Sequence, residues 1–212
     1  MMPVEKAMAF AREVFRDDSS GHDWFHTLRV YRLATFLAQQ EGADVQTVQL
    51  AALLHDVDDR KLSPETYARK SRARGFLEEN GVSAERITQI LRIIDEVSFR
   101  GTDSVRPGTP EGQCVQDADR LDAMGAVGIA RTFAYGGSRG RPIYDPEQPP
   151  QEVMDADAYV RRQSHSINHF YEKLLLLRDM MNTPTAKQLA RERHRWLELF
   201  LEEFLAEWDG KR

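Results

Sequence analysis

The chain has 212 residues, of which 41% are hydrophobic and 30% are charged, a balance typical of a folded globular domain and not of a disordered chain. The formal net charge of -5 excludes the overall positive field with which many proteins bind nucleic acid or anionic membranes. The single cysteine, Cys114, excludes an intramolecular disulfide bond. Because the sequence has neither a signal peptide nor an apolar run long enough to span a bilayer, we expect a cytoplasmic protein.

Helical patterns follow one another through the first half of the chain. Apolar residues recur every three or four positions, and Gly42, Ser83 and the pair Ser63-Pro64 supply the expected helix ends and starts. The expected helices cover residues 3–16, 22–41, 45–58, 64–80 and 83–97. The following stretch, residues 100–112, is rich in glycine and proline and is expected to be a loop.

The second half continues in the same way, with one long interruption. Helices are expected over residues 115–135, 155–182 and 184–208, with Thr183 capping the last of them. Proline, glycine and charged residues fill the segment between the first two, so we expect a long surface loop at about 136–154. The pattern predicts an all-α fold, a helical bundle that forms one domain over residues 1–212.

Aromatic residues on the last predicted helix leave the oligomeric state open. Trp196, Phe200, Phe204 and Trp208 recur at helical spacing. They suit either the core of this chain or part of a dimer interface. The sequence is therefore compatible with a monomer or a homodimer.

Several polar side chains interrupt helices that are otherwise apolar. His26 lies between Phe25 and Leu28, and His55 and Asp56 directly follow an apolar run that ends at Leu54. Three aspartates, Asp117, Asp119 and Asp122, lie in an alanine-rich and glycine-rich segment. Burying a lone carboxylate is costly, so several acids on core helices imply a buried cation or a polar cleft.

Histidine and carboxylate together suit a divalent metal ion. Adjacent helical residues point about 100° apart, so His55 and Asp56 can share one ion only near their common edge. His26 and Asp119 would complete a set of four ligands and leave room for water or substrate. The candidate ions are Mn, Fe, Co, Ni, Zn and Mg. The alternative is that each histidine is an ordinary hydrogen-bonded core residue.

The order of these residues carries a family resemblance. His26, then His55-Asp56, then Asp119 in ADRLDA resembles the H...HD...D signature of the HD-domain superfamily of metal-dependent phosphohydrolases. Longer motifs resemble one bacterial subfamily of small HD proteins, similar to nucleoside triphosphate pyrophosphohydrolases. These motifs are GHDWFHTLRV, LLHDVDDRK, VQDADRLDAMGAVGIARTF, IYDP and SINHFYEKLLLLRDMMNT. The resemblance covers nearly the whole chain and implies a single HD-type helical domain.

The resemblance also implies an activity. Such an enzyme uses water activated by one divalent metal ion to cleave a nucleoside or deoxynucleoside triphosphate to the monophosphate and pyrophosphate. Asp59 matches the acidic position that follows the HD pair in the superfamily, and we expect it to orient or deprotonate the attacking water. The alternative is an ordinary acid at a helix end, which is what we expect of Asp58.

Substrate phosphates need fixed positive or hydrogen-bonding groups in this acidic chain. Arg29 and Lys61 lie close in sequence to the predicted ligands, and Asn168, His169 and Lys173 match the subfamily pattern. Further candidates for the pocket are His22, Arg120, Asp122 and His165. The predicted partner is a small nucleotide, with no nucleic acid and no membrane. The basic stretch ARKSRARG, residues 68–75, is expected to be a solvated helix face.

Other functions remain open at this point. A 5'-nucleotidase or a phosphodiesterase of the same fold would use the same metal site, and a non-catalytic module would bind metal and nucleotide without turnover. An HD-type di-iron oxygenase needs further histidines between the HD pair and the last aspartate. Residues 57–118 contain none.

Overall fold

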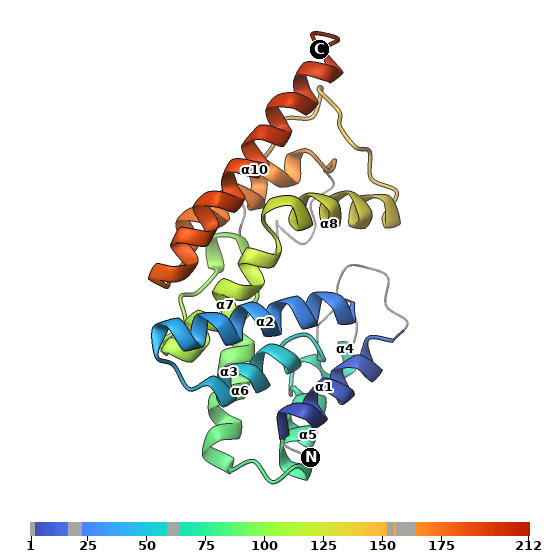
Figure 1. The fold of residues 1–212 in the computed structure, drawn as a ribbon. Coiled ribbons are helices and arrows are strands. Elements are labelled where there is room, and N and C mark those ends of the chain that lie inside the picture. Colours follow the sequence, from blue (N-terminus) through green and yellow to red (C-terminus); the bar gives the residue numbers. More distant parts are fainter. Residues whose placement is uncertain (1–2, 17–22, 59–63, 152–154, 156–163) are drawn as a thin grey trace. The chain divides into compact units, whose positions relative to one another are not determined.

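Figure 1 shows the chain in a computed structural model, which describes residues 3–16, 23–58, 64–151, 155 and 164–212. All the regular elements formed by these residues are helices, which confirms the predicted all-α fold. None of these helices is long and apolar enough to cross a membrane. The helices form two compact units, Met1–Ser98 with Val105–Asp119, and Phe99–Ser104 with Arg120–Arg212. One domain spanning the whole chain therefore stays a prediction.

The first unit is built around one central helix. Its helices are α1 (Pro3–Val14), α2 (Trp24–Glu41), α3 (Val45–Leu54), α4 (Pro64–Tyr67), α5 (Ser71–Glu79), α6 (Ala84–Val97) and most of α7 (Pro110–Asp122). Helix α3 packs against α1, α2 and α6. It is apolar on nearly every side, and residues 50–54 are all buried, as expected for a core helix.

Local capping fixes the ends of these helices. Asp23 caps α2, and α2 ends at Gly42, which has a left-handed φ of 71°. Asp44 caps α3 by accepting a hydrogen bond from Thr47 N at 2.8 Å. Ser83 caps α6. The predicted helix end at Gly42 and the predicted cap at Ser83 are confirmed, whereas Ser63 lies outside the described residues.

Two predicted helices of this unit are shorter than expected. Helix α3 ends at Leu54, not at residue 58, so His55 and Asp56 lie in the turn that follows it. The predicted helix over 64–80 is divided into α4 and α5 because Lys70 has a left-handed φ of 48°. Such a φ breaks the helical hydrogen-bond ladder, and no glycine in the sequence marks the position.

The second unit contains η1 (Gly101–Asp103), α8 (Gly125–Ser138), the π-helix η2 (Phe170–Leu174), the 3-10 helix η3 (Leu176–Met180) and α10 (Pro184–Trp208). Helix α10 packs against α8 and η3, and Thr183 caps it as predicted. The prediction of one α-helix over 155–182 is wrong for the described part. Ser166 N and Ile167 N donate to the carbonyls of Pro142 and Ile143 at 3.0 and 3.1 Å, so the chain there pairs with the preceding loop. Residues 156–163 lie outside the described residues.

The predicted helix over residues 115–135 is also divided. Helix α7 ends at Asp122, and α8 starts at Gly125, which has a left-handed φ of 69°. Helix α8 then continues through Gly136 and Gly137 to Ser138, past the predicted stop. Residues 139–151 form no helix, in agreement with the predicted loop.

An aromatic cluster forms part of the core of the second unit. Phe200 on α10 stacks on Phe170, with ring centroids 5.5 Å apart, and Phe204 lies 6.0 Å from Tyr144. Phe200 and Phe204 are half-buried and pack on aromatic rings of this chain. Trp196 is 61% exposed and belongs to the surface.

Cys114 on α7 is fully buried in the first unit. Burial, followed by the nearby charges of Asp117, Glu41 and Glu111, raises the pKa of its thiol to about 12. Because the thiolate is the reactive form, we expect Ellman's reagent at pH 8 to label the native protein very slowly and the unfolded chain rapidly. Rapid labelling of native protein would contradict the buried position.

Candidate metal centre

The first turn of α2 fixes His26. The Asp23 carboxylate accepts a hydrogen bond from the backbone amide of His26 at 2.7 Å, which caps the helix at this residue. The His26 side chain is 1% exposed. The capped first turn of α2 therefore fixes the backbone of His26, whose imidazole is buried inside the first unit.

The turn after α3 carries the next two side chains. His55 is the C-cap of α3, and its Nδ1 atom lies 2.9 Å from the Ala52 carbonyl oxygen. A carbonyl only accepts, so Nδ1 carries the proton and Nε2 is left as the ligand atom. Nε2 is buried, makes no hydrogen bond to any described residue and lies 3.2 Å from Oδ2 of Asp56.

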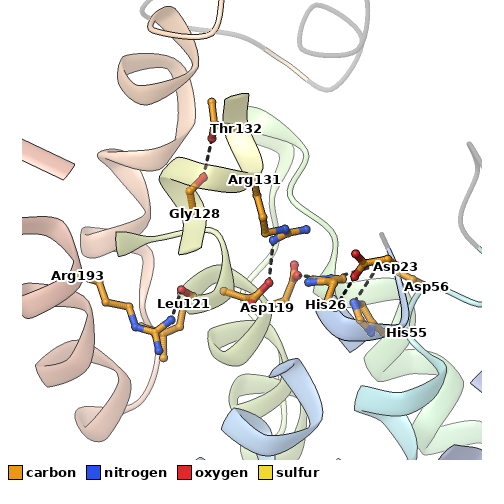
Figure 2. A network of polar contacts seen from close by, with 11 residues as sticks. Asp23, His26, His55, Asp56, Asp119, Leu121, Gly128, Arg131, Thr132 and Arg193 are labelled. Atoms are coloured by element: carbon orange, nitrogen blue, oxygen red, sulfur yellow. Dashed lines mark hydrogen bonds and ion pairs between the residues drawn. The ribbon is translucent and has the colours of Figure 1, made fainter. Parts of the chain in front are cut away.

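Asp119 approaches the same point from α7. Its Oδ1 atom lies 3.5 Å from His26 Nε2, and Asp56 Oδ2 lies 3.5 Å from the same nitrogen. Figure 2 shows the side chains of His26, His55, Asp56 and Asp119 pointing toward one another. The structure thus brings together the four residues that the sequence predicts as ligands, all within the first unit.

The spacing of these atoms fits a divalent ion. Two ligand atoms bound to one ion at about 2.1 Å lie about 3.0 to 3.4 Å apart, depending on the coordination angle. Three of the pairs, His55 with Asp56, His26 with Asp56 and His26 with Asp119, are 3.2 to 3.5 Å apart. Ligand atoms of His26, His55 and Asp56 all lie within 4.8 Å of one another. His26, His55 and Asp56 could therefore hold a first-row ion with little rearrangement, and Asp119 adjoins them through its contact with His26.

The electrostatics of the cluster favour positive charge. Burial acts to lower the pKa of His55, but the charge and proximity of Asp56, with further help from Asp119 and the Ala52 carbonyl, raise that pKa to about 9. Two carboxylates thus favour a cation beside His55. A divalent metal ion meets this requirement as a proton does.

Three predicted residues lie outside the described part of the chain: His22, Asp59 and Lys61. Their predicted roles stay predictions. Arg29 is described and lies half-buried on α2, one turn after His26.

Two predicted substrate residues hold the loop of the second unit. Asn168 Nδ2 donates to the Gln148 carbonyl at 2.9 Å, and His165 Nε2 lies 3.2 Å from the same oxygen. These bonds fix the loop against the start of η2. His169 is half-buried, and the Lys173 ammonium lies 5.0 Å from the centre of the Phe99 ring.

Arg120 and Asp122, the other candidates near Asp119, have structural partners in the second unit. Arg120 Nη1 donates to the carbonyl oxygen of Met180. Asp122 Oδ2 lies 2.9 Å from Arg131 Nη1. Asp117, on the same helix, is fully buried.

Sequence reasoning missed the part that Asp58 plays. Expected to be an ordinary helix-end acid, it is 1% exposed, and both its carboxylate oxygens accept backbone hydrogen bonds from α5. The partners lie 14 and 15 residues further on. The only signal in the sequence is the absence of a capping residue before α5, where Lys70 stands.

Comparison with known proteins places this site in context. A protein-family model described as "HD domain" matches residues 24–124. The Bacillus subtilis (strain 168) protein YpgQ is 41% identical over 93% of this chain and 90% of its own length. In structural superposition, the crystal structure of YpgQ in complex with ADP shows 36% identity and a TM-score of 0.77, covering 99% of this chain and 100% of that one.

Two further solved structures are similar over almost their whole length. A protein from Lactobacillus plantarum is 41% identical, with a TM-score of 0.87, and covers 98% of this chain and 97% of its own. An HD-superfamily hydrolase from Bacillus thuringiensis is 45% identical, with a TM-score of 0.76, and covers 97% of this chain and 96% of its own.

Proposed function

The chain belongs to the HD-domain superfamily of hydrolases, and we propose that it is a metal-dependent phosphohydrolase that cleaves a nucleoside or deoxynucleoside triphosphate to the monophosphate and pyrophosphate. The observation that carries the proposal is the cluster of two buried imidazoles and two carboxylates, in which three histidine–aspartate pairs are 3.2 to 3.5 Å apart. The similar protein YpgQ forms a complex with ADP, which supports a nucleotide as the ligand.

We assign His26, His55, Asp56 and Asp119 as the ligands of one divalent ion. Asp56 is central, because its Oδ2 atom lies 3.2 Å from His55 Nε2 and 3.5 Å from His26 Nε2. An ion in this site would supply an acidified water as nucleophile and would neutralise phosphate charge. Two carboxylates balance the charge of one divalent ion, so compensation of the substrate's phosphate charge falls in large part to basic side chains.

The chain's own residues would then orient the reaction. The Ala52 carbonyl holds the His55 ring so that Nε2 faces the cluster. Arg29, one turn after His26, is the basic residue nearest to that histidine in the sequence and is proposed to contact a substrate phosphate. Asp59, which follows the ligand pair, is proposed to hold or accept the proton of the attacking water.

The remaining substrate contacts are proposed from the sequence pattern. Lys61, His169 and Lys173 would bind phosphate oxygens, and Asn168 would contact the nucleotide or keep the loop in place. Asn168 and His165 already share the Gln148 carbonyl, so replacing either of them would also loosen residues 139–151.

The test is a hydrolysis screen of metal-stripped protein with one ion added back at a time. Mn, Co, Ni, Mg or Zn is combined with nucleoside triphosphates, monophosphates or cyclic nucleotides, and pyrophosphate and phosphate are measured separately. We expect pyrophosphate release that depends on the added ion and disappears with a chelator, because the ligand set has no other source of an activated water.

The products distinguish the alternatives. Phosphate released from monophosphates would make the protein a nucleotidase, and opening of cyclic nucleotides would make it a phosphodiesterase. Metal and nucleotide binding without product from any substrate would replace hydrolysis with a binding function.

A further inference from the structure

The carboxylate of Asp58 occupies the N-terminus of α5. Its Oδ1 atom accepts a hydrogen bond from the backbone amide of Arg72 at 3.1 Å, and its Oδ2 atom accepts one from Ala73 at 2.9 Å. The residue is 1% exposed. Both oxygens of a buried, negatively charged group are therefore aimed at the amides of one helix end, where the helix dipole favours negative charge.

Helix α5 has no cap of its own at this end. The residue in the N-cap position is Lys70, which has a left-handed φ of 48° and makes no capping hydrogen bond with its side chain. Its ammonium group instead lies 3.3 Å from Asp95 Oδ1 and donates to the Tyr67 carbonyl at 3.0 Å. The first amides of α5 are satisfied from a distant part of the chain because no local residue serves them.

The turn that carries the ligand pair is held by contacts on both sides. Within the turn, Val57 N donates to the Leu54 carbonyl at 3.3 Å. Helix α3 ends at Leu54, so the peptide groups around His55 and Asp56 are no longer held by a continuing helix. One side of the turn is fixed by the contact between the His55 ring and the Ala52 carbonyl. The other side is fixed by Asp58, two residues after Asp56.

We propose that Asp58 is a positioning residue of the metal centre, which holds the His55-Asp56 turn by clamping it to the N-terminus of α5. This inference rests on the proposed metal site. Ligands held in place before the ion arrives bind it more tightly, since less freedom is lost on binding. By linkage, the same clamp makes ion binding stabilise the first turn of α5.

The first experiment compares ion affinity in two capping variants. In Asp58→Asn the side chain keeps its shape, but its NH2 group takes the place of one oxygen and cannot accept the hydrogen bond that a backbone N–H of α5 donates there. We expect Mn²⁺ binding to metal-stripped protein, measured by titration calorimetry, to weaken about 10- to 100-fold.

The matched control is Asp44→Asn, which removes the charge from another capping aspartate of the same unit. Asp44 caps the far end of α3 through Thr47 N at 2.8 Å. Asparagine keeps the one oxygen with which Asp44 caps the helix, so this variant should lose little stability and bind Mn²⁺ as the wild type does. Equal Mn²⁺ affinity in wild type and Asp58→Asn would overturn the positioning role.

Hydrogen exchange of the wild type tests the linkage without a variant. Mn²⁺ should slow exchange of the amides of Arg72 and Ala73 by the same mechanism, while the capped amide of Thr47 serves as reference. Unchanged exchange at the first two amides in Mn²⁺-saturated protein would also overturn the positioning role. A wild type that binds no divalent ion would instead overturn the proposed metal site, together with the role that depends on it.

Discussion

The double replacement His55→Ala/Asp56→Ala is expected to abolish metal-dependent hydrolysis while the helical fold remains. It removes two of the four proposed ligands, including the carboxylate that lies within 3.5 Å of both imidazoles. Loss of a residue that only supports a ligand typically costs 10- to 100-fold, so loss of two ligands should lower kcat/KM by at least about 1,000-fold. The measurements are kcat/KM for pyrophosphate release, bound metal per chain and the far-ultraviolet circular dichroism spectrum.

The fold should persist because the two replaced groups are a pair of opposite charges that leave together, since the pKa of His55 is raised to about 9 beside Asp56. Their joint removal leaves neither partner buried alone, and replacing a buried ion pair by apolar side chains is often close to neutral in stability. The thermal midpoint of the metal-free variant should therefore lie close to that of the metal-free wild type.

A matched control removes another buried histidine together with the carboxylate that it contacts. His194 on α10 is 6% exposed, and its Nε2 atom lies 3.2 Å from Glu198 Oε1. We expect His194→Ala/Glu198→Ala to keep its bound metal and its hydrolytic rate. Equal rates in the wild type and the His55→Ala/Asp56→Ala variant would show that the cluster is not the catalytic centre.

The four clustered residues could be predicted from the sequence because each signal was local. His26, His55, Asp56 and Asp119 are polar residues in apolar helical segments, and a known order of residue types connects them. The structure brings their ligand atoms together, while their role as ligands stays a proposal. Caps such as Ser83 were predictable for the same reason, since a capping side chain bonds an amide two or three residues away.

The features that sequence reasoning missed depend on distant partners. Helix α3 ends at Leu54 and not at the predicted residue 58. Beyond that end, the His55 ring contacts the Ala52 carbonyl and the Asp58 carboxylate accepts hydrogen bonds from α5. The partners of Asp58 lie on α5, and no periodicity within its own segment reveals them. Lys70 has a left-handed φ although it is not glycine, so the residue type at this position does not indicate a helix break.

The joint between α7 and α8 was missed because its glycines stand in an otherwise helical pattern. The predicted helix over 115–135 includes Gly125 and Gly128 as interior positions. In the structure, Gly125 has the positive φ that turns the chain, and Gly128 meets the backbone of the segment before the turn. Glycine in such a place reports a close approach of backbone, which only the three-dimensional structure can show.

The replacement Gly128→Ala is expected to destabilise the protein strongly. An added Cβ would lie 2.1 Å from the carbonyl oxygen of Ala123 and 2.4 Å from its carbon. Both are backbone atoms, so no side-chain rotation relieves the clash and the joint itself must open. Overpacking of this kind costs about 3 kcal/mol. For a chain of this size that loss corresponds to a fall in the thermal midpoint of roughly 6 to 12 °C.

Gly137→Ala provides the matched control on the same helix. An added Cβ there has no atom within 4 Å, and alanine is the better helix former by up to about 1 kcal/mol. The two variants make the same chemical change, so the difference in their free energies of unfolding, measured by urea denaturation, isolates the clash at the joint. Equal stability of the two would mean that α8 can move away from Ala123 at little cost, and that Gly128 is present for another reason than close packing.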